Sequence, residues 1–161
     1  GRLDEAQRDV DEACAQLQQV VDREPSMERI DALMEAGFER AVVRFQRRDF
    51  DAALQEASGL IAAWAALARR APGRIDLQQR ILMALDLRER AASELGRHQE
   101  ALADQTRVVD GLRALLEAGA PRDLAQALVL TLERRAGTRR LLGDHARAAE
   151  DLAEARRLAL A

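Results

Sequence analysis

The sequence LGRHQEA, residues 95–101, returns as LGDHARA at residues 142–148. Fainter copies occur as RRDFDAA at residues 47–53 and as GRLDEA at residues 1–6. Aligning these four stretches matches Gly1, Arg48, Gly96 and Gly143, which are 47, 48 and 47 residues apart. A fixed period of this length is typical of repeat proteins, in which each repeat is one unit of secondary structure that stacks on its neighbours.

Between these stretches, apolar residues recur every three or four positions, which predicts amphipathic α-helices. Each 47-residue period holds two such stripes, so the chain should form about seven helices. A second set of markers, Pro25, Pro72 and Pro121, falls between the glycine turns with spacings of 47 and 49 residues. Proline interrupts helices, and Ser26 and Asp49 are expected to cap the helices that follow them. The sequence therefore predicts an all-α, antiparallel helix-pair solenoid.

The same markers divide residues 1–161 into the parts of a single repeat domain. The expected parts are one unpaired helix at 1–24 and three helix pairs at 26–71, 73–119 and 121–161. Because the first helix lacks a preceding partner and natural arrays end in polar capping repeats, we expect the chain to be a fragment of a longer protein.

Composition excludes several classes of protein. The chain is 48% hydrophobic and 33% charged, with a net charge of −3 and both signs mixed along its length. Nucleic-acid binding proteins usually gather a basic excess on one face, so a nucleic-acid partner is not expected. No 18-residue apolar run is present and the first 20 residues are too charged for a secretory signal. We therefore expect no membrane span and a cytoplasmic location, and the single cysteine, Cys14, should pack as a small hydrophobe.

The repeated positions resemble the tetratricopeptide-repeat (TPR) family. Its conserved alanine after the turn matches Ala6, Ala53, Ala101 and Ala148, and its preceding aromatic or apolar position matches Leu3, Phe50, His98 and His145. Its small position in the first helix of each pair matches Ala41 and Ala136 but falls on Glu89 in the middle repeat. The period is longer than the family's usual 34 residues and is similar to long-helix variants such as kinesin-light-chain-like repeats and arrays of bacterial signalling proteins. The resemblance implies a right-handed superhelix whose role is binding.

No pattern predicts catalysis, a cofactor or a metal site. The chain contains no GxSxG, HExxH or glycine-rich phosphate loop. The two histidines, His98 and His145, occupy equivalent repeat positions. Equivalent positions in stacked repeats are separated by at least the 8–10 Å between packed helices, so we interpret both as packing or capping side chains rather than joint metal ligands. We expect the chain not to be an enzyme.

If the resemblance holds, the first helix of each pair lines a concave groove that binds a peptide or helix of a protein partner. The expected groove residues are Phe38, Val42, Phe45, Asp86, Arg90, Glu94, Glu133 and Arg140, together with Ser93 and Gly137. The alternative is that Phe38 and Phe45 are core residues, as we expect for Trp64. Two other functions also remain open: structural self-association through the exposed end helices, and a regulatory or sensor domain of a larger bacterial signalling protein.

Overall fold

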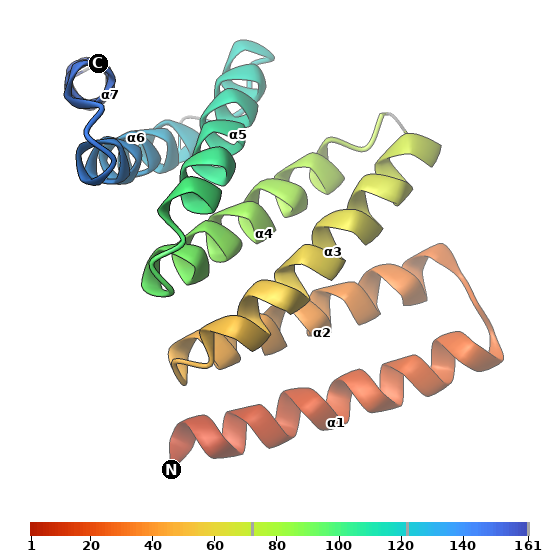
Figure 1. Ribbon diagram of the computed structural model, residues 1–161. Coiled ribbons are helices and arrows are strands. Elements are labelled where there is room, and N and C mark those ends of the chain that lie inside the picture. Colours follow the sequence, from red (N-terminus) through yellow and green to blue (C-terminus); the bar gives the residue numbers. More distant parts are fainter. Residues whose placement is uncertain (72, 122, 161) are drawn as a thin grey trace. The chain divides into compact units, whose positions relative to one another are not determined.

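The computed structural model describes residues 1–71, 73–121 and 123–160. This part of the chain is all-α and consists of seven helices, as the sequence predicts. Their bounds are α1 Arg2–Arg23, α2 Met27–Gln46, α3 Phe50–Arg70, α4 Ile75–Glu94, α5 His98–Glu117, α6 Asp123–Leu141 and α7 His145–Ala159. Consecutive helices pack as antiparallel neighbours in four pairs, α1 with α2, α2 with α3, α5 with α6 and α6 with α7 (Figure 1). The expected helix break at Pro72 lies outside the described residues, but α3 ends at Arg70 and α4 begins at Ile75 on either side of it.

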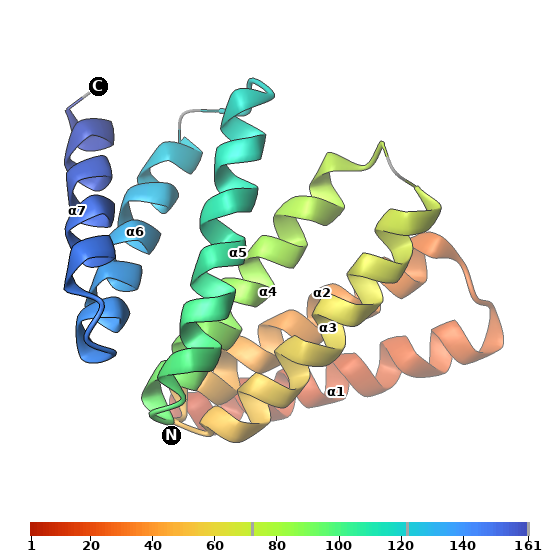
Figure 2. The ribbon, with the colours of Figure 1, turned by 45° about the horizontal axis from the view of Figure 1, so that its top comes forward.

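The helices form two compact units that divide within α4. Unit 1, residues 1–87, contains α1, α2, α3 and the first part of α4, and in it α2 packs against both α1 and α3. Unit 2, residues 88–161, contains the rest of α4 with α5, α6 and α7. In unit 2, α6 packs against both α5 and α7, which lie on either side of it in Figure 2. Each unit therefore has its own core.

The repeated turn motif is a helix-ending structure with a residue in the left-handed region. Arg48, Gly96 and Gly143, the aligned anchor positions, have φ values of 65°, 71° and 83°. One residue further along the chain, a backbone N–H donates back across the turn in each case. These hydrogen bonds are Asp49 to Arg44 (2.9 Å), Arg97 to Ala92 (2.8 Å) and Asp144 to Arg139 (2.8 Å). This pattern satisfies carbonyls that the helix end would otherwise leave unpaired, so the sequence motif marks where one helix stops.

The predicted helix caps are also confirmed. The Ser26 hydroxyl accepts a hydrogen bond from the Arg29 N–H at 3.2 Å, and the Asp49 carboxylate accepts one from the Ala52 N–H at 3.4 Å. Asp144 repeats this arrangement at the start of α7, with the Arg147 N–H at 3.2 Å. These side chains satisfy N–H groups that the first helical turn cannot pair internally.

Three of the four repeated alanines lie in the cores of the two units, whereas Ala6 is half-buried. Ala53, Ala101 and Ala148 are between 0 and 1% exposed, and Ala41 and Ala136 on the preceding helices are equally buried. Small side chains at these positions allow neighbouring helices to approach closely. In α1, Cys14 is buried, as expected of a packed hydrophobe, and burial raises the pKa of its thiol above the ordinary value.

Replacing Gly96 by alanine is expected to lower the free energy of unfolding of unit 2 by about 1 kcal/mol, because an L-residue in the left-handed region is strained. A Cβ added to Gly96 meets no atom within 4 Å, so backbone strain is the only cost. Gly137, inside α6, also has open space for a Cβ, and its replacement by alanine should raise stability by about 0.8 kcal/mol through helix propensity. Urea titrations followed by circular dichroism measure the free energy of unfolding of both variants. If both substitutions change it in the same direction, the left-handed conformation assigned to Gly96 is contradicted.

Candidate functional site

Unit 1 contains an open cavity of about 650 Å³ bounded by α2, α3 and the first part of α4. Two helices line it with stripes of the same spacing, at positions i, i+3, i+4 and i+7, so that one face of each helix borders the cavity. The α2 stripe is Ala32, Glu35, Ala36 and Glu39, and the α4 stripe is Asp76, Gln79, Arg80 and Met83. Phe38 of α2 and Trp64 of α3 complete the lining.

The base of this cavity is aromatic. Trp64 is 2% exposed, and its ring lies 6.2 Å from that of Phe38 at an interplanar angle of 55°. The indole Nε1 is buried and has no hydrogen-bond partner among the described residues. On the α4 side, Met83 is 54% exposed. Apolar surface is therefore available at the cavity wall, next to the packed rings of Phe38 and Trp64.

Charged groups surround this apolar surface. Arg80 forms ion pairs with Glu35 at 2.5 Å and with Asp31 at 3.3 Å. Arg74 forms an ion pair with Asp76, and its hydrogen bond lowers the pKa of that exposed carboxyl. In contrast, Glu39 has no ion pair among the described residues, although it borders the cavity. A cationic group of a bound molecule would therefore meet an uncompensated carboxylate there.

Of the predicted groove residues in unit 1, only Phe38 borders the cavity. Phe38 borders the cavity and packs on Trp64, so it is at once a wall and a core residue. Phe45 packs edge-on against Phe50 of α3, with ring centroids 5.3 Å apart, and is not part of the lining. Val42 and Asp86 are half-buried and also lie outside the lining.

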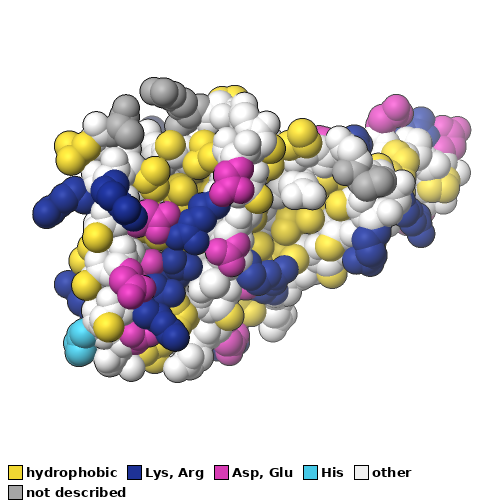
Figure 3. All heavy atoms as spheres, turned by 90° about the horizontal axis from the view of Figure 1, so that it is seen from above, with side chains coloured by type: hydrophobic (Ala, Val, Ile, Leu, Met, Phe, Trp, Pro, Cys, Tyr) yellow, Lys and Arg dark blue, Asp and Glu magenta, His cyan; other side chains and the backbone are white. Residues whose placement is uncertain are grey.

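The predicted groove residues of unit 2 are surface side chains. Arg90 and Glu94 of α4 and Glu133 and Arg140 of α6 are all exposed. Arginines and acidic side chains are interleaved over unit 2, on the left of Figure 3. Because this surface carries both signs, these residues do not form a patch of one charge, and their role in binding stays a prediction.

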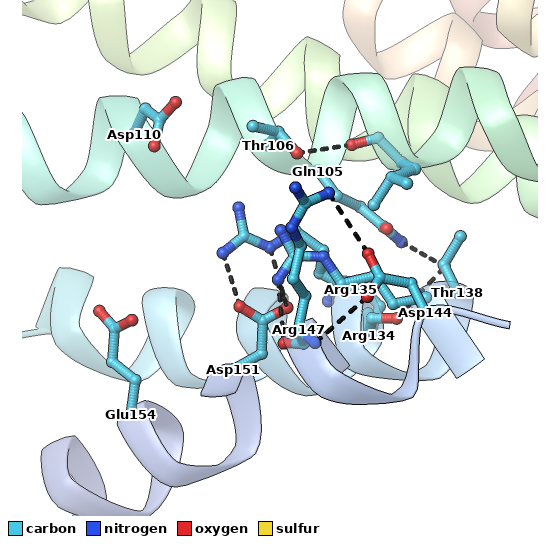
Figure 4. A network of polar contacts seen from close by, with 12 residues as sticks. Gln105, Thr106, Asp110, Arg134, Arg135, Thr138, Asp144, Arg147, Asp151 and Glu154 are labelled. Atoms are coloured by element: carbon cyan, nitrogen blue, oxygen red, sulfur yellow. Dashed lines mark hydrogen bonds and ion pairs between the residues drawn. The ribbon is translucent and has the colours of Figure 1, made fainter. Parts of the chain in front are cut away.

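Unit 2 also contains a buried polar network (Figure 4). The Asp151 carboxylate of α7 accepts hydrogen bonds from Arg135 Nη2 at 2.6 Å and Nε at 3.0 Å, and pairs with Arg139 at 2.7 Å. The Arg135 and Asp151 side chains are only 5% and 3% exposed. This network joins α6 to α7, because Arg135 and Arg139 of α6 and Asp151 of α7 neutralise one another.

Glu89 stands at a repeat position where a small residue is expected. A second part of the network explains how a glutamate fits there. Glu89 is 1% exposed, although the equivalent positions hold Ala41 and Ala136. Its carboxylate pairs with Arg134 at 2.7 Å and accepts a hydrogen bond from Gln105 at 2.9 Å. Gln105 also donates to Thr138 at 3.1 Å. A carboxylate is therefore tolerated in the core of unit 2 because three polar side chains accompany it.

Most of the cavity lining was not predicted from the sequence. The predicted groove residues of α2 were Phe38, Val42 and Phe45, whereas the lining consists mainly of small, acidic and basic residues that no motif marks. The signal was available in the spacing of the two stripes, since Ala32 and Gln79 are one period of 47 residues apart. Reading them together would have required knowing which face of α2 is turned toward α4.

Among the residues that the structure describes, no group of three or more histidine, cysteine, aspartate or glutamate side chains is placed to hold a metal ion. None of the helices in the same ranges is long and apolar enough to cross a membrane. No protein-family model matches this sequence, and comparison with curated proteins finds no matching relative.

Proposed function

We propose that this chain is a non-catalytic protein-interaction module of the tetratricopeptide-repeat type, in its long-helix form. The 47- to 48-residue period, the left-handed turn residues and the buried repeat alanines support this proposal. In such an arrangement helix pairs stack as a solenoid, and binding uses the surface lined by the first helix of each pair. The cavity of unit 1 is bordered mainly by α2 and α4, which hold that place in their pairs.

The observation that carries the proposal is the combination of aromatic base, exposed methionine and charged rim in this cavity. Binding surfaces concentrate their energy in apolar anchors at the centre, surrounded by polar groups. Phe38 and Met83 offer the apolar contact, Trp64 packs against Phe38 in the core, and Glu39 offers a carboxylate beside them. The ligand that fits is a peptide or helix of a protein partner that places a large apolar side chain next to an arginine or lysine.

A phage-displayed library of random peptides tests this proposal, with the purified chain as bait. Enriched sequences should combine a large apolar residue with a basic one. A synthetic peptide of the enriched sequence should lose about tenfold or more in affinity for the variant Met83→Asp, because a charge would then occupy the apolar wall. Isothermal titration calorimetry measures the affinity, and circular dichroism verifies that the variant is folded.

Met27→Asp provides a matched control. Met27 is 42% exposed, lies in the same unit and is not part of the cavity lining, so this variant should bind the peptide as the wild type does. Glu39→Arg should weaken binding of the basic peptide by removing the carboxylate and adding a like charge. The proposal fails if no sequence is enriched, or if Met83→Asp and Met27→Asp bind the enriched peptide equally.

A further inference from the structure

One arginine of the cavity wall is shared by two carboxylates. Arg80 of α4 lines the cavity, and its Nη1 lies 2.5 Å from Glu35 Oε1 and 3.3 Å from Asp31 Oδ1. Both acidic residues belong to α2, but Glu35 is 57% exposed whereas Asp31 is only 17% exposed. Because a single nitrogen lies close to both, a small rotation of the guanidinium is enough to transfer it from one carboxylate to the other.

Asp31 has an acceptor atom that is not in use. Its Oδ1 is buried and has no hydrogen-bond partner among the described residues, although Arg80 Nη1 is near. A buried acceptor without a hydrogen bond is unfavourable, so turning an N–H of Arg80 toward it would stabilise that arrangement. Arg74 reaches the other oxygen, Oδ2, at 3.4 Å, but it also pairs with Asp76. Asp31 is therefore available as a second partner for Arg80.

Glu35 shares its face of the cavity with Glu39. Residues four apart lie on one face of a helix, and both of these glutamates are exposed and line the cavity. The rest of the α2 stripe consists of Ala32 and Ala36, so small side chains border the two carboxylates. Among the described residues, Glu35 pairs with Arg80 and Glu39 has no ion pair. The two glutamates thus form a subsite for a cation at which Arg80 neutralises one carboxylate.

We infer that Arg80 is an internal competitor for this cation subsite: a basic side chain of the ligand replaces Arg80 at Glu35, and Arg80 turns to Asp31. In the bound state the ligand neutralises Glu35 and Glu39, while the released arginine supplies the hydrogen bond that Asp31 Oδ1 lacks. The favoured ligand side chain is arginine, because its planar guanidinium can contact both glutamates, whereas a lysine ammonium is a point charge. The inference rests on the function proposed for the cavity of unit 1 and describes how binding there is controlled.

The dipeptide acetyl-Leu-Arg-amide is a probe with the required chemistry. Acetyl-Leu-citrulline-amide is its uncharged control, in which a urea group replaces the guanidinium. Trp64 is the only tryptophan of the chain and lines the cavity, so its indole ¹H–¹⁵N signal reports occupancy. Titrated to about 10 mM, because a ligand with few contacts binds weakly, the arginine peptide should shift this signal saturably. The citrulline peptide should bind about fivefold or more weakly.

Removing the competitor should strengthen binding. Arg80→Gln should bind the arginine peptide about threefold or more tightly, because no free energy is then spent on releasing Glu35. Arg29→Gln is the matched control, since Arg29 also pairs with a glutamate of unit 1, Glu24, but lies outside the cavity lining. This variant should bind as the wild type does. Urea titration followed by tryptophan fluorescence verifies that unit 1 is folded in each variant.

Asp31 separates an exchange of partners from a general effect of charge. Asp31 is not part of the cavity lining, yet Asp31→Asn should weaken binding about twofold or more, because Arg80 then has no second partner and stays on Glu35. In the Arg80→Gln background the same substitution should have a much smaller effect. If Asp31→Asn weakens binding equally in both backgrounds, Asp31 acts only through its charge and the exchange is wrong.

The exchange can also be measured without a ligand. Replacing Glu35 by glutamine should leave Arg80 to Asp31 alone. A double-mutant cycle of Arg80→Gln and Asp31→Asn measures the coupling of this pair, with tryptophan fluorescence in urea as the readout for unit 1. In the Glu35→Gln background the coupling should increase by about threefold in the unfolding equilibrium constant, within the range of partly exposed ion pairs. An unchanged coupling would contradict the shared arginine.

The binding data distinguish failure of this inference from failure of the proposed function. If Met83→Asp weakens binding of the arginine peptide but Arg80→Gln does not strengthen it, the cavity is a binding site and Arg80 is not its competitor. If the peptide binds neither the wild type nor Arg80→Gln, both the cation subsite and the function proposed for the cavity are rejected.

Discussion

Replacing Asp151 by alanine should lower the free energy of unfolding of unit 2 by about 3–5 kcal/mol, the usual result of removing one partner from a buried ion pair. The Asp151 carboxylate neutralises Arg135 and Arg139, of which Arg135 is almost fully buried. Without it, the Arg135 guanidinium stays in the core with no carboxylate opposite. Urea titration followed by far-ultraviolet circular dichroism measures the loss.

The exposed pair in the same unit gives the control. Asp110 is 64% exposed and lies 3.5 Å from Arg113, so Asp110→Ala should cost at most about 1 kcal/mol. Replacing Asp151, Arg135 and Arg139 together by leucine should recover most of the loss, because no unpaired charge is then buried. A loss for Asp151→Ala as small as that for Asp110→Ala would contradict the buried pairing.

The single tryptophan of the chain makes this experiment informative about both units. Trp64 lies in unit 1 and Asp151 in unit 2. Tryptophan fluorescence therefore follows unit 1 alone, whereas circular dichroism follows all helices. If the two units unfold in separate transitions, Asp151→Ala should shift the circular dichroism curve and leave the fluorescence midpoint in place.

Replacing Trp64 by alanine should lower the free energy of unfolding of unit 1 by about 3–5 kcal/mol, as large-to-small changes of buried aromatic residues generally do. Trp64 is 2% exposed and packs against Phe38, with ring centroids 6.2 Å apart. Removing the indole would enlarge the existing cavity and leave Phe38 without its aromatic neighbour. Circular dichroism in urea is the appropriate measurement, since the variant lacks the fluorescent residue.

Two further variants separate the causes of this loss. Trp64→Phe should cost much less, about 1 kcal/mol, because no described residue accepts a hydrogen bond from the indole N–H and a ring still packs on Phe38. Met83→Ala, at the exposed wall of the same cavity, should stay within about 0.5 kcal/mol of the wild type. A similar loss for Trp64→Ala and Met83→Ala would show that Trp64 is not a core residue.

The stability of Trp64 variants also bears on the two interpretations of the aromatic residues in α2. Phe38 contacts the core through Trp64 and borders the cavity, so the choice between groove and core does not apply to it. Phe45 lies against Phe50 instead. A binding test should therefore alter Met83 or Glu39, whose replacement leaves the aromatic packing intact, and not Phe38.

The sequence by itself determined the features that depend on neighbouring residues along the chain. The apolar spacing predicted seven helices, and Ser26 and Asp49 were recognised as caps because a cap acts within one helical turn. The period located Arg48, Gly96 and Gly143, which the structure shows in the left-handed conformation. Each of these outcomes is local, so a short stretch of sequence contains the information that decides it.

Only the tertiary structure decided which side chains meet across helices. Arg135 donates a hydrogen bond to Asp151, 16 residues further along the chain. Glu89 is tolerated in the core because Arg134, 45 residues further on, donates a hydrogen bond to its carboxylate. Likewise, the cavity of unit 1 is lined by Ala32, Glu39 and Met83, not by Phe45. The rotation of each helix about its axis determines which side chains face one another. That rotation results from the packing of whole helices. A helical stripe read from the sequence fixes the rotation only within about one residue, or 100° of arc, which is enough to exchange one lining side chain for another.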